Sequence, residues 1–235
     1  SDVLGEADGG GATVTYDPET KTLTLDGANI TDTHSVPGGG NAAILSYDDL
    51  KISLAEGSEN KITLNDSGIL TGVTAVSGEG TNNDVKNVTI SGNGSLDIDI
   101  TTSNATAFGI MGSAVTIDGG AEVGVTVNGT STKNIISYIG VMGYSSVAIK
   151  GNSTVTATVN DNAGSNIAIM SAGTVTIEEA EVTASGYSGI MSRAGDISIN
   201  GESTVTATGS AYAIASGQNN NITWDDNLTA EGRAD

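Results

Sequence analysis

The chain has 235 residues and a formal net charge of −20, from 28 acidic and 8 basic residues. Such a negative field repels nucleic acids and anionic membranes, no apolar run is long enough to span a bilayer, and the absence of cysteine excludes a disulfide framework. Only 3% of the residues are aromatic, and the apolar side chains are mostly Val, Ile and Ala, which suit β-strands better than a conventional globular core.

The first forty residues predict a cap rather than a repeat. Residues 12–30 contain a Pro-containing turn between two runs of alternating apolar and polar residues, and they predict an N-terminal hairpin. Residues 31–41, with one proline and three glycines, predict a protruding loop. We therefore predict two regions: residues 1–41 hold the hairpin or cap, the first coil and the loop, and residues 42–235 form one continuous set of coils.

From residue 23 onward one short pattern recurs: two β-branched or aliphatic residues flank a small residue, and a turn follows. Successive copies start roughly 22 to 36 residues apart, which is a spacing typical of repeat architectures. The eight copies are Leu23–Leu25, Ile52–Leu54, Val88–Ile90, Val115–Ile117, Val147–Ile149, Val175–Ile177, Ile197–Ile199 and Ile222–Trp224.

Two further strands accompany the later copies. The second strand follows the first as Leu96–Ile100, Val123–Val127, Val155–Val159, Val182–Ala184, Val205–Ala207 and Leu228–Ala230. A third segment precedes the first strand as Phe108–Met111, Ile139–Met142, Ile167–Met170 and Ser188–Met191. Every methionine ends one of these segments, and no Cys or His accompanies it, so we expect stacked methionines that fill a core or corner rather than a soft-metal site.

Three short strands per repeat predict the fold. We expect an all-β protein, a single-stranded right-handed parallel β-helix (a β-solenoid) of about eight coils with three short strands per coil. Glycine tolerates the positive φ that a tight corner requires, and it recurs four residues after the first strand begins, at Gly92, Gly119, Gly151 and Gly201. A propeller needs four antiparallel strands per blade, more than these repeats contain.

The segment Tyr16–Ala28, YDPETKTLTLDGA, resembles the opening motif of pectate-lyase-like β-helix proteins exported by Gram-positive gut bacteria. Repeated Gly-Ile, Val-Thr-Ile-x-Gly and Val-Thr-Ala segments are similar too, and the likeness covers nearly the whole chain. The resemblance implies an extracellular or cell-surface location. It also implies carbohydrate binding, because some members are described as calcium-associated carbohydrate-binding modules.

The residues that an enzyme on this scaffold would use are few. A polysaccharide lyase needs a basic group, and Arg193 is the candidate, with a solvated or ion-paired arginine as the alternative. A glycoside hydrolase needs two carboxylates, and Asp97 and Asp99 alternate on one strand, roughly 6.6 Å apart, a spacing that suits an inverting pair. The other residues of polygalacturonase-like hydrolases are missing, and the single histidine, His34, lies in the predicted loop.

Asp97 and Asp99 also predict a cation site. Neighbouring coils would bring Asn65 and Thr126 close to them and form an oxygen-rich patch that suits calcium. The alternative is that these carboxylates only make the surface acidic and soluble.

Three tyrosines predict a ligand-binding line. Tyr138, Tyr187 and Tyr212 each fall two or three residues before an aliphatic residue of the third segment, so they lie close to one column. Phe108 has a similar place, and Tyr144 lies in a neighbouring corner. Exposed rings in a line would form a platform for sugar rings, whereas the alternative is that they cover the core at a corner.

The sequence therefore predicts a non-catalytic, exported β-helix module that binds carbohydrate or acts as an adhesive or structural element at the cell surface. The alternatives are a polysaccharide lyase or glycoside hydrolase, and a surface rod that self-associates through its exposed end coils. The expected partner is a polysaccharide or cell-surface glycan, without nucleic acid binding or membrane insertion. Calcium is the one possible cofactor.

Overall fold

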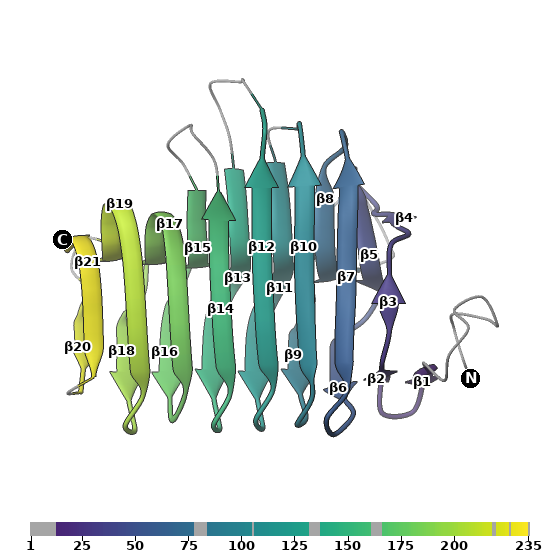
Figure 1. The fold of residues 1–235 in the computed structure, drawn as a ribbon, viewed down its shortest axis with the longest axis horizontal. Coiled ribbons are helices and arrows are strands. Elements are labelled where there is room, and N and C mark those ends of the chain that lie inside the picture. Colours follow the sequence, from purple (N-terminus) through teal and green to yellow (C-terminus); the bar gives the residue numbers. More distant parts are fainter. Residues whose placement is uncertain are drawn as a thin grey trace.

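The computed structural model describes residues 13–77, 84–104, 106–131, 137–160, 166–217, 220–225 and 227–234. Every regular element in these ranges is a β-strand, and the strands form one large, mostly parallel sheet that is not closed. Figure 1 shows the arrows side by side along the long axis, from β1 near the N-terminus to β21 near the C-terminus. No helix in these ranges could cross a membrane.

The sheet contains three parallel ladders, that is, three series of strands paired in parallel. Successive strands of the chain belong to the three ladders in turn. The first ladder consists of β2 (Thr22–Asp26), β6 (Leu50–Leu54), β9 (Val88–Ser91), the second halves of β11 (Thr106–Asp118) and β13 (Ser137–Lys150), β16 (Thr174–Glu178), β18 (Ile197–Asn200) and β20 (Ile222–Trp224). The second ladder consists of β3 (Asn29–Ile30), β7 (Glu59–Asp66), β10 (Ser95–Thr102), β12 (Glu122–Gly129), β14 (Thr154–Asn160) and the first halves of β17 (Glu181–Ser192), β19 (Thr204–Ser216) and β21 (Leu228–Ala234).

The third ladder completes the pattern. It consists of β5 (Asn41–Ser46), β8 (Leu70–Ala75), the first halves of β11 and β13, β15 (Asn166–Ser171) and the second halves of β17, β19 and β21. Several long strands thus bend from one ladder into the next without leaving the extended conformation. This arrangement is consistent with a β-solenoid, and each predicted strand of the three repeating sets lies in the expected ladder.

One predicted register is wrong by two residues. The sequence pattern equates Ile52 with Val88, but the first ladder pairs Ile52 with Ile90 and Leu50 with Val88. A shift by two residues keeps every side chain on the same face of a strand. Alternation of apolar and polar residues therefore cannot detect this shift, and only the pairing of the folded chain decides it.

The N-terminal end of the sheet carries the antiparallel pairs. β1 (Thr13–Asp17) pairs with β2 as the predicted hairpin, and the Asp17 carboxylate accepts hydrogen bonds from the backbone N–H of Glu19 and the hydroxyl of Thr20. The predicted loop contains a short strand, β4 (His34–Ser35), which pairs with the start of β5. The division of the chain at residue 41 stays a prediction.

An exposed ion pair links this end to the next repeat. The Lys21 ammonium donates a hydrogen bond to the Asp48 carboxylate and lowers the pKa of Asp48 below its ordinary value of 3.8. A lowered folded pKa contributes stability above the unfolded pKa, and that contribution is lost as the pH falls through the folded value. We expect Asp48→Asn to make the loss of thermal stability below pH 3.8 shallower. The difference should be small and should shrink in high salt, because both groups are exposed.

Inward side chains of the three ladders form one continuous core of Val, Ile, Leu and Ala. The methionines form a separate cluster, because Met111, Met142, Met170 and Met191 pair in register along the third ladder. Met142 and Met170 are buried, and the cluster also contains Ile139 and Ile167. The expected filling of a core or corner by stacked methionines is confirmed.

Candidate functional site

The outward side of the second ladder is a regular polar surface, which we call the second-ladder face. Its inward residues, such as Leu96, Val123 and Val155, are buried, so the alternate residues point outward. Register brings them into columns of carboxylates and hydroxyls. The face consists of Asp97, Asp99, Glu122, Gly124, Thr126, Thr154, Thr156, Glu181, Thr183, Thr204 and Thr206.

Asp97 and Asp99 both point outward, as the sequence predicts, but their neighbours differ from the expected set. Thr126 lies opposite Asp99, whereas Asn65 lies opposite Thr101 and is not beside the aspartates. The Lys61 ammonium stands 3.0 Å from an Asp99 carboxylate oxygen. Within the described ranges, no group of three or more His, Asp or Glu side chains could hold a metal ion. Calcium binding at Asp97 and Asp99 stays a prediction, and a calcium ion would have to compete with the Lys61 ammonium for the Asp99 carboxylate.

Gly124 opens a notch in the second-ladder face. It stands between Asp97 and Thr156 in a column where the neighbouring strands carry side chains. The position lines a hollow of about 200 Å³, which is also bordered by Asp97, Asp99, Glu122, Thr154 and Thr156. A Cβ atom at Gly124 would lie 2.3 Å from Oδ1 of Asp97, so the carboxylate leans over the gap.

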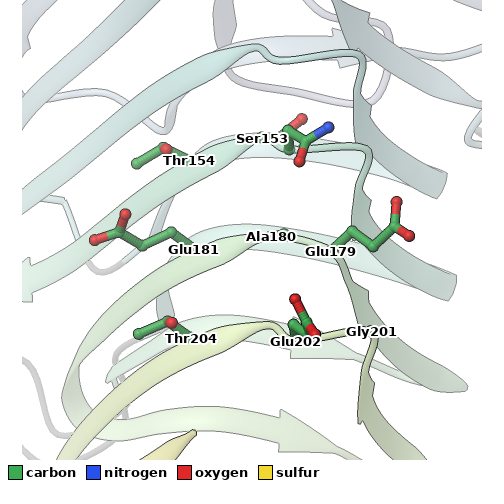
Figure 2. A pocket seen from close by; sticks show the side chains of 9 residues that line it. Ser153, Thr154, Glu179, Ala180, Glu181, Gly201, Glu202 and Thr204 are labelled. Carbon is green, nitrogen blue, oxygen red and sulfur yellow. The ribbon is translucent and has the colours of Figure 1, made fainter.

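A wider hollow lies at the corner before the second ladder, next to the notch (Figure 2). It has a volume of about 700 Å³ and shares Thr154 with the notch. Figure 2 shows the carboxylates of Glu179 and Glu181 pointing in opposite directions, with Glu202 in the turn between β18 and β19. These carboxylates do not converge on one point, so the corner adds negative charge and hydroxyl groups to the second-ladder face without forming a chelating site.

The catalytic candidates are not brought together. Arg193 is exposed in the turn between β17 and β18, and its backbone N–H donates to the carbonyl oxygen of Ser171. β17 lies three ladder steps from β10, which carries Asp97 and Asp99. At about 4.8 Å per step the separation along the axis is roughly 14 Å. Arg193 and the two aspartates therefore lie in different parts of the molecule, and the lyase and hydrolase alternatives stay separate predictions.

The predicted line of tyrosines is wrong for Tyr138. Its side chain is 0% exposed and belongs to the main core, and its hydroxyl donates to the carbonyl oxygen of Asn104. Tyr138 pairs with Ala107 and Asn166, whereas Tyr212 pairs with Ser188, which is one column further along the strand. Tyr187 is 40% exposed at a register shift in β17. These tyrosines therefore form no common platform.

A third concave site surrounds Tyr144, whose side chain is 49% exposed. We call it the Tyr144 cleft, and its volume is about 590 Å³. It lies where β11 and β13 bend from the third ladder into the first. Its lining residues are Val36–Gly39, Asp84–Lys86, Met111, Ser113 and Tyr144. The sequence places Tyr144 in a corner but not in a cleft, because the opposite walls come from segments that lie 58 to 108 residues earlier in the chain.

Comparison with protein-family models, with curated proteins and with solved structures gave no match.

Gly124 is the feature that sequence reasoning missed on the second-ladder face. The available signal was its position: a glycine in the interior of a predicted strand often marks a close approach or a missing side chain.

Proposed function

We propose that this chain is an exported, non-catalytic glycan-binding module that acts at the cell surface. It would belong to the pectate-lyase-like right-handed parallel β-helices, with about eight coils of three short strands each. The eight members of the first ladder support that coil number. The resemblance of the opening segment and the repeated motifs to that family supports the handedness and the exported location.

The observation that carries the proposal is the second-ladder face. It is in register over five strands, from β10 to β19, and the residues that compose it present hydroxyl, carboxylate and backbone groups. Hydroxyls and carboxylates are the groups that hydrogen-bond sugar hydroxyls, and the Gly124 notch adds a recess bordered by them. A rigid sheet holds these groups in place before a ligand arrives, which reduces the entropy cost of binding.

The polysaccharide-cleaving alternatives receive less support from the same geometry. Asp97 and Asp99 point to the same side of one strand, and an ion pair with Lys61 engages Asp99. An inverting hydrolase needs its two carboxylates on opposite sides of the scissile bond. Arg193 as a lyase base lies on another part of the fold.

Gly124→Thr tests the proposed face. Threonine restores the column of side chains, and Asp97 can turn aside because its carboxylate is the flexible end of the side chain. We expect stability to rise by about 0.5–1 kcal/mol, because glycine weakens a strand interior. We expect retention on polysaccharides that the wild type binds to fall roughly tenfold, equivalent to about 1.4 kcal/mol. Affinity electrophoresis and pull-down on insoluble polysaccharides, with thermal unfolding in parallel, measure both effects.

Ala148→Thr is the matched control, because it adds most of a threonine side chain between Thr116 and Thr176 on the outward side of the first ladder. It should leave retention unchanged. Equal retention by the wild type and Gly124→Thr would contradict the proposed site, and release of oligosaccharides from the polysaccharide would contradict the non-catalytic function. Repeating the assay with calcium and with a chelator tests the metal prediction at Asp97 and Asp99.

A further inference from the structure

The Tyr144 cleft combines features that the second-ladder face lacks. The Tyr144 ring is about half exposed, and apolar wall residues such as Pro37 and Met111 line the same hollow. Asp84 and Lys86 bring one negative and one positive group to it. Small-molecule sites are typically hollows of 300–1,000 Å³ with apolar or aromatic walls and a few polar groups. At about 590 Å³, the Tyr144 cleft lies within that range.

The walls of the cleft are held by backbone hydrogen bonds. The loop with Pro37 is closed by the bond from the N–H of Val36 to the carbonyl oxygen of Gly40. The Lys86 N–H donates to the carbonyl oxygen of Ala75, and the N–H of Ser113 donates to that of Lys86. Two walls of the cleft, at Lys86 and Ser113, are therefore tied to the sheet and to each other, and the loop with Pro37 is closed by its own hydrogen bond. Walls held in this way reduce the ordering that binding would require.

The chemistry of the lining indicates the class of ligand. An exposed tyrosine ring offers a flat apolar surface at low entropy cost, which matches the C–H face of a pyranose ring. One carboxylate and one ammonium provide an acceptor and a donor for hydroxyl groups while their charges offset each other locally. The protein as a whole carries a charge of −20, which repels an anionic ligand such as a uronate.

We propose that the Tyr144 cleft is a second glycan site, in which an uncharged pyranose ring stacks on Tyr144 and its hydroxyl groups bond Asp84 and Lys86. The site is separate from the second-ladder face, and the proposal rests on the proposed function only for the ligand class, a glycan. A module with two glycan sites on different faces can bridge two polysaccharide strands, which gives an adhesive its avidity.

The test uses the full chain and a panel of uncharged oligosaccharides of gluco-, manno-, galacto- and xylo-configuration, together with oligogalacturonate as the charged counterpart. Tyr144→Ser should weaken binding at the cleft by roughly tenfold, and Tyr144→Phe should retain it because the ring stays. Tyr47→Ser is the matched control, because Tyr47 is 57% exposed outside the cleft. Calorimetric titration with the bound oligosaccharide should give two sites for the wild type and one for Tyr144→Ser.

The outcomes separate the two sites. Binding that Gly124→Thr weakens and Tyr144→Ser leaves unchanged would overturn the cleft proposal and leave the second-ladder face standing. Binding that only Tyr144→Ser weakens would support the cleft and overturn the second-ladder face. A preference for oligogalacturonate, or an equal loss in Tyr47→Ser, would overturn the cleft as a site for uncharged sugars. Absence of binding to every glycan would overturn both proposals.

Discussion

Replacement of Tyr138 by alanine is expected to lower the free energy of unfolding by about 3–5 kcal/mol, the range for removal of a large buried aromatic side chain. The side chain is fully buried in the main core. Its ring also lies directly over Gly129, where an added Cβ atom would overlap the ring. Deletion therefore leaves a cavity and removes the hydrogen bond to the carbonyl oxygen of Asn104. Chemical denaturation followed by circular dichroism measures the change.

Tyr187→Ala is the control for this prediction. The Tyr187 side chain is 40% exposed, so its removal should change stability by less than about 0.5 kcal/mol. Tyr138→Phe should fall between the two, with a loss of about 1–3 kcal/mol, because the ring stays and only the hydrogen bond is lost. Similar losses in Tyr138→Ala and Tyr187→Ala would show that Tyr138 is not a core residue.

Replacement of Gly92 by alanine is expected to cost about 3 kcal/mol or more, through strain and overlap together. Gly92 has a φ of +106°, a conformation that residues with a Cβ atom rarely adopt. An added Cβ atom would also lie 2.2 Å from the carbonyl oxygen of Leu54, the last residue of the neighbouring strand β6. That oxygen belongs to the backbone of a buried strand, so it cannot move aside. Thermal unfolding of the variant measures the loss.

Gly119→Ala is the matched control, because Gly119 occupies the equivalent corner of the next repeat. Its φ is +66°, and the nearest atom to an added Cβ lies 3.7 Å away. Only the strain of the left-handed conformation then applies, about 1–2 kcal/mol. Glu179 adopts a φ of +50° in the same kind of corner, so a side chain can be accommodated there. Equal losses for Gly92→Ala and Gly119→Ala would contradict the role of the Leu54 contact.

The difference between Gly92 and Gly119 also shows why the corners are rich in glycine but not uniform. Neighbouring corners differ in φ and in clearance, although they follow equivalent strands. A repeat in the sequence therefore predicts where a corner lies, but it does not predict how tightly the corner packs against the previous one.

The strands of the later repeats could be predicted from the sequence, whereas those of the earlier repeats could be predicted only in part. From Val88 onward, strict alternation and turn glycines mark most strands, because a strand with one buried face requires that pattern. In the first two repeats the sequence indicates only the first-ladder strands, Leu23–Leu25 and Ile52–Leu54. β3, β7, β5 and β8 lie beside later strands that carry clearer patterns, and their pairing is a property of the ladder rather than of the local sequence.

The tyrosines show why a functional site is harder to predict than a scaffold. Tyr138 and Tyr144 are six residues apart in one strand, β13, yet the first is fully buried and the second is 49% exposed. The strand bends between them from the third ladder into the first, so alternation cannot be counted across the bend. The cleft beside Tyr144 needs residues near positions 37 and 85 as walls, and no local pattern connects these segments.

The sequence by itself determined the all-β class, the three sets of repeating strands, the outward aspartates and the stacked methionines, since each follows from a period of two and a repeated spacing. Only the tertiary structure decided the register between the early repeats, the burial of Tyr138, the ion pair of Lys61 with Asp99, and the notch and cleft. The reason is physical. The side of a strand to which a residue points is a local property, whereas the register of the strand and the hollows on its surface depend on which segment lies beside it.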